Sequence, residues 1–161
     1  MLANYLQNKL QEKIKDRKPD FTVGKDYLRR WWIIPRNSFF NVYYHEFRVS
    51  DDDRSLHDHP YFNLSFILKG SYMEHTPDGV FVRKAGDMKV RLPWTLHRLQ
   101  LGFSLPNDEH HVWTLFITGP RIRAWGFQAG PIVKNWLGFR TKSGWMHHTD
   151  YIDKYGEQLN N

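Results

Sequence analysis

No cysteine occurs among the 161 residues, so neither a disulfide nor a thiolate metal ligand can form. Any bound metal ion must therefore be held by histidine, carboxylate, backbone carbonyl or water. No apolar run approaches the roughly 18 residues of a membrane span, and the first 18 residues are charged throughout, unlike a signal peptide. These absences predict a cytoplasmic protein with no membrane segment.

No run of lysine and arginine occurs either, although these residues outnumber aspartate and glutamate by 23 to 17 and give a net charge of +6. The missing run argues against nucleic acid as a partner. The basic balance favours a small anionic ligand, although a solvated basic surface would give the same balance. Aromatic residues make up 16% of the chain, which suits a β-sheet fold and a pocket lined by rings.

The order of apolar residues predicts one helix followed by many short strands. Leu6, Leu10 and Ile14 recur every four residues and predict a helix over 4–16. Beyond it, short runs rich in aromatic and β-branched residues alternate with turn residues. The predicted strands are 27–34, 39–49, 62–69, 71–76, 80–84, 88–92, 96–102 and 111–118.

Strands at roughly 8–12-residue spacing are typical of an all-β sandwich or barrel. A chain of 161 residues is expected to form one domain over 1–161, with its barrel core at about 37–125. Residues 126–161 are expected to form a C-terminal extension on the outside of the barrel, with a short helix near 150–157.

The segment Leu56-His57-Asp58-His59-Pro60 has the pattern of a metal site. On a strand, residues two apart face the same side, so His57 and His59 would direct both imidazoles into one space while Asp58 points the other way. His97, on a later predicted strand, can close such a site from the opposite wall.

These residues resemble the first of two signature motifs of the cupin superfamily. That motif reads His-x-His, then Glu, then Gly, and it is matched by His57, His59 and Gly70, with Asn63 where the family has Glu. The chain looks most similar to short single-domain cupins of bacterial and bacteriophage genomes.

The second signature motif runs from Gly through Pro to His and is matched by Gly86, Pro93 and His97. The resemblance implies an all-β cupin barrel (double-stranded β-helix, or jelly roll) with an N-terminal helix and a C-terminal extension. It also implies a metal held by His57, His59 and His97, with Asn63 in the fourth ligand position.

Three neutral imidazoles suit a divalent transition metal, with Fe(II) favoured and Zn, Ni or Mn as further candidates. The leading hypothesis is a metal-dependent oxidoreductase, dioxygenase-like, acting on a small polar or anionic substrate. One alternative is a non-catalytic binding module for an anionic molecule such as a nucleotide or sugar nucleotide. Another is a metal-free sugar-nucleotide epimerase or isomerase, although the sequence shows no His–Asp pair to orient a base.

Further residues are candidates for roles beside the histidines. If Glu74 points inward, it is a candidate catalytic base or substitute ligand, and otherwise it is an exposed strand carboxylate. Arginine forks bind carboxylate or phosphate, and tyrosines can line a pocket or donate a proton. The candidate substrate-binding residues are Arg91, Arg98, Tyr61 and Tyr72.

Two expectations concern the surface. The acidic run Asp51-Asp52-Asp53 is interpreted as a solvated loop. The resemblance implies a homodimer that covers a sheet edge, and residues 1–34 are the candidate contact.

Overall fold

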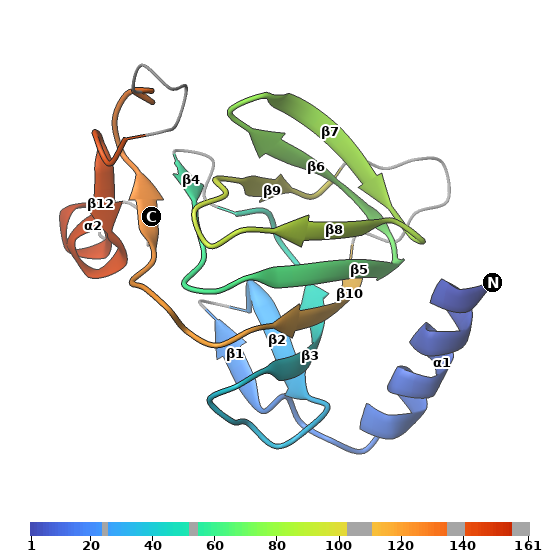
Figure 1. The fold of residues 1–161 in the computed structure, drawn as a ribbon. Coiled ribbons are helices and arrows are strands. Elements are labelled where there is room, and N and C mark those ends of the chain that lie inside the picture. The colour runs from blue at the N-terminus through green and yellow to red at the C-terminus, as the bar shows by residue number, and fades with distance from the viewer. Residues whose placement is uncertain (24–25, 52–54, 103–110, 135–140, 156–161) are drawn as a thin grey trace.

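The computed structural model describes residues 1–23, 26–51, 55–102, 111–134 and 141–155 (Figure 1). Helices α1 (Leu2–Ile14) and α2 (His148–Tyr155) lie at the two ends of the chain. The strands between them are β1 (Phe21–Val23), β2 (Leu28–Trp32), β3 (Asn41–Phe47), β4 (Leu56–His57), β5 (Asn63–Lys69), β6 (Ser71–Thr76), β7 (Gly79–Lys84), β8 (Met88–Arg91), β9 (Arg98–Gln100), β10 (Val112–Thr118), β11 (Gly126–Gln128) and β12 (Trp145–His147).

The helix predicted over 4–16 is confirmed but begins and ends two residues earlier. A strand lies within each predicted strand range, except that β7 begins one residue before the predicted 80–84. The second helix is also present near its predicted position, although residues 156 and 157 lie outside the described ranges. Strands β1, β4, β11 and β12 were not predicted, because each has only two or three residues and shows no alternation.

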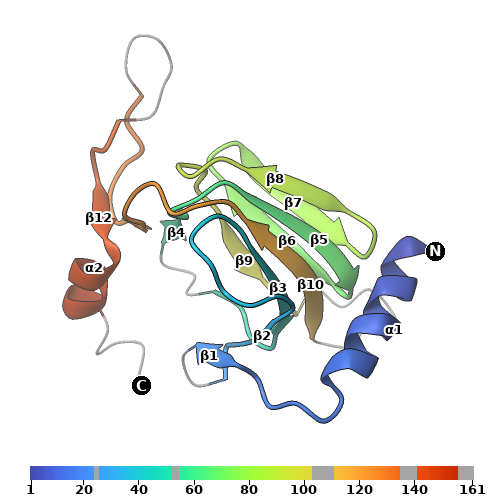
Figure 2. The same ribbon diagram turned by 60° about the horizontal axis from the view of Figure 1, so that its bottom comes forward.

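The strands form two facing antiparallel layers. One is a six-stranded sheet in the order β1-β2-β3-β10-β5-β8, and the other contains β7-β6-β9. An antiparallel bridge between His57 and His97 adds β4 beside β9, so that β4-β9-β6-β7 face β3-β10-β5-β8 (Figures 1 and 2). Eight strands in this order form a jelly roll, which confirms the predicted all-β fold.

The space between the layers is filled by side chains from both sheets. Along β10 every second residue is buried, as expected for a strand with one face toward a core. The interior apolar cluster contains Ile67 and Val112 from one sheet and Tyr72 and Leu99 from the other. The two layers therefore share a single core between them.

A second core lies on the outer face of the six-stranded sheet, where α1 covers it (Figure 2). Leu10 and Ile14 pack with Trp31, Tyr44 and Phe66, which the strand alternation turns away from the barrel interior. The buried side of α1 thus packs against the six-stranded sheet of its own chain. Strand β2 extends that sheet beyond the predicted barrel core. The homodimer stays a prediction.

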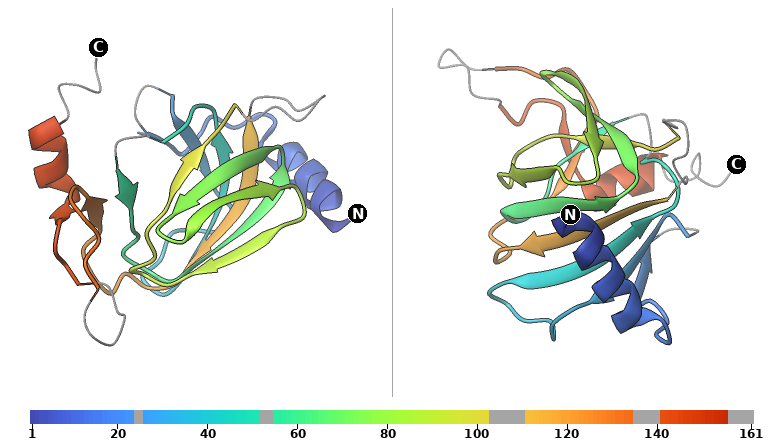
Figure 3. Two further views of the ribbon diagram at one scale, coloured as in Figure 1. Left: turned by 90° about the horizontal axis from the view of Figure 1, so that it is seen from above. Right: turned by 90° about the vertical axis from the view of Figure 1, so that its right-hand side faces the viewer.

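The C-terminal extension attaches to β4 at one side of the barrel (Figure 3). Strand β11 pairs with β4 on one side and with β12 on the other. The ring of Tyr151 in α2 stacks on Phe127 at 4.1 Å, and its hydroxyl bonds Ser55 at 2.9 Å. The extension therefore supports the strand that carries His57. No helix in the described ranges is long and apolar enough to span a bilayer.

Candidate metal centre

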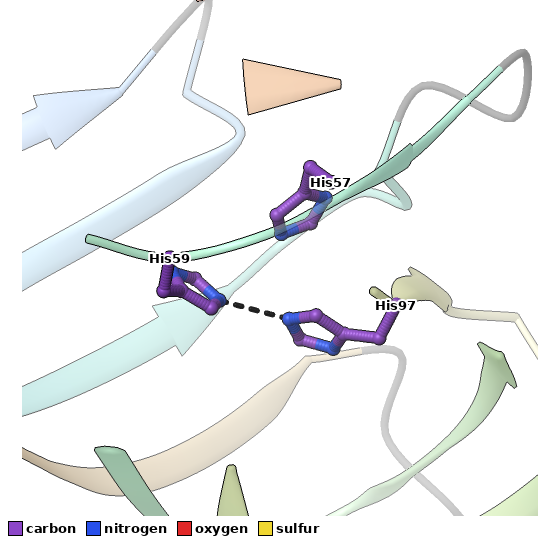
Figure 4. Close-up of side chains that lie close together, drawn as sticks. All are labelled: His57, His59 and His97. Atoms are coloured by element: carbon purple, nitrogen blue, oxygen red, sulfur yellow. Dashed lines mark hydrogen bonds between the residues drawn. The ribbon is translucent and has the colours of Figure 1, made fainter. Parts of the chain in front are cut away.

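Three imidazoles converge where β4 meets the start of β9 (Figure 4). The ring centroids of His57, His59 and His97 lie 4.7 to 5.2 Å apart, and one nitrogen from each ring lies within 4.8 Å of the others. The Nε2 atoms of His59 and His97 are only 2.8 Å apart. The three predicted metal-binding histidines are therefore brought together as one cluster.

Backbone pairing explains this convergence of residues forty positions apart in the chain. The amide of His57 donates to the carbonyl of His97 at 2.8 Å, and the amide of His97 donates back to the carbonyl of His57 at 2.9 Å. Asp58 turns to the other side of the chain, as predicted, so that His59 returns toward His97. The bridge thus fixes the two halves of the cluster against each other.

Asp58 anchors the segment between the two histidines to the C-terminal extension. Its carboxylate is fully buried and accepts hydrogen bonds from Arg123 at 2.8 Å and from the Gly126 amide and Trp145 Nε1, each at 2.9 Å. These donors all follow β10, the last of the eight jelly-roll strands in sequence. The extension therefore helps to hold the backbone that presents His57 and His59.

Glu74 lies behind His97, with its Oε1 atom 3.5 Å from His97 Nδ1. The carboxylate is completely buried and accepts from Arg91 on one oxygen and from Arg83 on the other, at 2.8 Å each. Burial alone would raise the pKa of Glu74, but the nearby His97 ring and the hydrogen bonds from Arg91 and Arg83 outweigh it and hold the pKa well below its ordinary value. Glu74 therefore points inward as an anion paired with two arginines, and its role as a catalytic base or substitute ligand stays a prediction.

Arg91 is likewise occupied. Its guanidinium contacts Glu74 and donates to Ser65 Oγ at 3.0 Å, and its side chain is 1% exposed. A guanidinium that already neutralises a buried carboxylate has little left to offer an incoming anion. Arg91 thus holds Glu74 in place, and its predicted role in binding substrate stays a prediction.

Asp51 lies behind His57, with Oδ2 3.8 Å from His57 Nδ1. Its carboxylate accepts from the Leu99 amide and the Tyr27 hydroxyl, and its side chain is only 7% exposed. The interpretation of Asp51 as part of a solvated loop was therefore wrong. Asp52 and Asp53 lie outside the described residues. In sequence, an acidic run looks like a solvated loop. Only the folded chain, in which the Asp51 amide bonds the Leu99 carbonyl, brings Asp51 next to His57.

The environment keeps the imidazoles of His59 and His97 neutral. Burial, together with the charge of Arg91, lowers the pKa of His97 to about 3. Burial and the neighbouring His97 and His57 lower the pKa of His59 well below its ordinary value. Neutral imidazoles have the lone pairs that a metal ion needs, so no proton has to be displaced near neutral pH.

The other predicted site residues lie at different distances from the cluster. Tyr61 stacks on His59 with ring centroids 5.9 Å apart, whereas Tyr72 is 1% exposed within the interior core. Arg98 follows His97, so the strand alternation turns it to the opposite face, where it pairs in register with His75.

Asn63 is buried on β5, and its Oδ1 atom has no hydrogen-bond partner among the described residues.

The donor set fits a transition-metal ion. Two metal–imidazole bonds of about 2.0–2.1 Å span up to about 4.2 Å, close to the separations of the three nitrogens. Histidines that bind metals characteristically direct their other ring nitrogen toward a carboxylate or carbonyl. His57 faces Asp51 and His97 faces Glu74 in this way.

No family model matches this sequence, and no curated protein matches it. Among solved structures, an uncharacterised Klebsiella pneumoniae protein with a double-stranded β-helix domain superposes with a TM-score of 0.48 at 15% identity, covering 65% of this chain and 87% of that one. A cupin superfamily protein from Desulfitobacterium hafniense gives 0.46 at 11% identity, with 62% and 84% covered. A DMSP lyase from Ruegeria pomeroyi gives 0.49 at 14% identity, with 64% and 54% covered.

Likeness at these levels concerns the fold alone and carries no argument about activity. The assignment of the fold depends on the chain itself: the order of its eight jelly-roll strands and the histidines where β4 meets β9. The strand order is that of a double-stranded β-helix, which confirms the predicted fold, and the three histidines form a candidate metal site within it.

Proposed function

We propose that the protein is a metal-dependent enzyme, dioxygenase-like, that acts on a small polar or anionic substrate at the cluster of His57, His59 and His97. The observation that carries this proposal is the convergence of three imidazoles, two of them backed by buried carboxylates. A bound transition-metal ion supplies Lewis-acid or one-electron chemistry, and Fe(II) is favoured over Zn, Ni or Mn.

The chain's own residues would prepare the site in three ways. Asp51 and Glu74 orient the rings of His57 and His97 by facing their Nδ1 atoms. Burial keeps His59 and His97 neutral at neutral pH, so that each ring has one nitrogen lone pair for a metal ion. We further propose that Asn63 lies at the fourth position, where its unpaired Oδ1 would accept a hydrogen bond from a bound water or substrate.

The test is metal content followed by dioxygen uptake. Protein purified without chelator is analysed for Fe, Zn, Ni and Mn, then loaded with Fe(II) and assayed with panels of thiols and organic acids. We expect one ion per chain and uptake with at least one substrate panel, both lost in H97Q. The matched control is H75Q, because His75 lies on the neighbouring strand and bonds Gln100 at 2.7 Å. Failure of wild-type protein to take up any of these metals would end the proposal.

A second candidate is metal-free acid–base chemistry on a sugar nucleotide. The Asp51–His57 contact supplies the His–Asp pair that the sequence did not show, and Tyr61 stacks beside His59 as a proton donor. This candidate predicts that sugar nucleotides raise the melting temperature of metal-free protein and that D51N abolishes the shift. Metal uptake with substrate binding but no turnover would instead favour a non-catalytic binding module.

A further inference from the structure

Arg30 is an interior arginine that the sequence analysis did not select. Strand β2 turns Trp31 outward into the cluster beneath α1, so its neighbour Arg30 faces the barrel side of the sheet. There it lies directly opposite His45 in the register of β2 and β3. Its Nε donates to His45 Nε2 at 2.8 Å, and its guanidinium carbon lies 4.6 Å from the ring centre of Tyr43.

These two contacts hold the guanidinium without neutralising it. Burial and the charge of Arg30 lower the pKa of His45 well below its ordinary value, so His45 is a neutral acceptor. Within the described parts of the chain, no carboxylate lies in ion-pair range of Arg30, and its two terminal nitrogens donate no hydrogen bond. Arg91, by comparison, is fully paired with Glu74.

The guanidinium of Arg30, with its two free terminal nitrogens, lies near the histidine cluster. The ring of His45 stacks on Phe116 at 5.1 Å, and Phe116 lies 5.9 Å from His59 and 6.2 Å from Tyr61. One aromatic ring therefore separates the side chain that holds Arg30 from a candidate metal ligand.

Arg36 adds positive charge beside Arg30. Its guanidinium carbon lies 5.4 Å from the ring centre of Trp32, which is two residues after Arg30 on β2 and therefore shares its face. Arg36 is exposed and forms no ion pair within the described residues. An anion approaching this side is attracted before it reaches Arg30.

We propose that Arg30, oriented by His45 and Tyr43, binds the carboxylate of the ligand that occupies the histidine cluster, so that the substrate class is small organic acids. This inference rests on the proposed function for the location of the second contact. A planar guanidinium with two free terminal nitrogens matches a carboxylate in a two-point hydrogen bond. The rings of Tyr43 and His45 beside the guanidinium favour a flat acid.

The test is calorimetric titration of the full-length protein with benzoate and with benzamide, which has the same shape but no charge. R30Q removes the charge, and R30K keeps the charge but loses the fork. The matched control is R29Q, since Arg29 is the neighbouring residue on the opposite face and is paired with Asp26. Melting temperature and metal content are measured on every sample.

We expect benzoate to bind wild-type protein and R29Q, and to bind R30Q at least about tenfold more weakly. R30K should be intermediate with a wild-type melting temperature, which excludes misfolding as the cause. Benzamide should bind at least about tenfold more weakly than benzoate. Equal binding of the two compounds, wild-type affinity in R30Q and R30K, or no benzoate binding to wild-type protein would each overturn the proposal.

The same samples separate this inference from the metal proposal. R30Q should retain its metal, because Arg30 contacts none of the three histidines. Benzoate binding that depends on Arg30 in a protein that takes up no metal would leave the anion site standing and refute the metal proposal. Metal uptake without benzoate binding would do the reverse.

Discussion

The substitution D58N tests how the C-terminal extension supports the candidate metal site. Asp58 is fully buried and receives three hydrogen bonds, one of them from the charged Arg123. Asparagine keeps the shape but replaces one acceptor oxygen with an amide donor, which then faces Arg123 and Trp145. Neither of these donors can then be satisfied at that atom.

The expected loss follows from these contacts. Breaking a buried ion pair costs about 3–5 kcal/mol, and a hydrogen bond to a charged group contributes about 1.5–3 kcal/mol. The Arg123 side chain is 23% exposed, so water replaces part of what it loses. We therefore expect unfolding free energy to fall by about 3 kcal/mol. For a chain of this size the melting temperature should fall by about 6–12 °C.

Urea denaturation and differential scanning calorimetry measure this loss, and a metal titration should show weaker binding by D58N because the same backbone presents both His57 and His59. The control is D78N, since Asp78 lies on an exposed turn and its replacement should change stability by less than about 0.5 kcal/mol. If D58N and D78N were equally stable, the anchoring role of Asp58 would be refuted.

Three further predictions concern the interior. E74Q should lower the free energy of unfolding by about 3–5 kcal/mol in urea denaturation, because it leaves the buried guanidinium of Arg91 unpaired. It should also weaken metal binding about 10–100-fold in titration. Unchanged metal affinity would contradict the role of Glu74 in orienting His97. In metal-free protein, the free energy of unfolding should fall as pH drops from about 6.5 towards 3, because burial lowers the pKa of folded His97 to about 3 whereas the unfolded chain gains a proton near 6.5. The free energy of unfolding should depend less steeply on pH in H97Q. An identical pH dependence in H97Q would contradict this reasoning. G70A should lower the free energy of unfolding by about 2 kcal/mol or more, because φ of Gly70 is +80° and a Cβ atom there would lie 2.8 Å from the His111 carbonyl oxygen. G119A should lower it less, because the nearest atom to a Cβ at Gly119 is 3.7 Å away. Equal losses in the two variants would refute this reasoning.

The barrel strands were predictable because one of their faces is buried and alternation records this in the sequence. Strand β10, for example, alternates buried and partly buried residues from Val112 to Thr118. The pair His57 and His59 was predictable for the same reason of spacing. Strand β4 itself was not, because two residues carry no period and its pairing partners lie at residues 97 and 127.

The residues that support the histidines could not be predicted with the same rules. Asp51 lies in an acidic run, and its contact with His57 exists only after the loop folds back onto β9. The pairing of Glu74 with Arg91 joins different strands and depends on register, which no local pattern fixes. Arg30 was within reach, since its neighbour Trp31 reads as an outward packing residue and alternation then turns Arg30 inward.

X-ray absorption spectroscopy of the Fe(II)- or Zn(II)-loaded protein tests most directly whether residues 57, 59 and 97 hold one ion. We expect nitrogen scatterers at the distances usual for imidazole, about 2.0–2.2 Å, with the outer-shell scattering of three rings in wild-type protein and of two rings in H97Q. A spectrum of oxygen ligands alone, or one unchanged by H97Q, would contradict it.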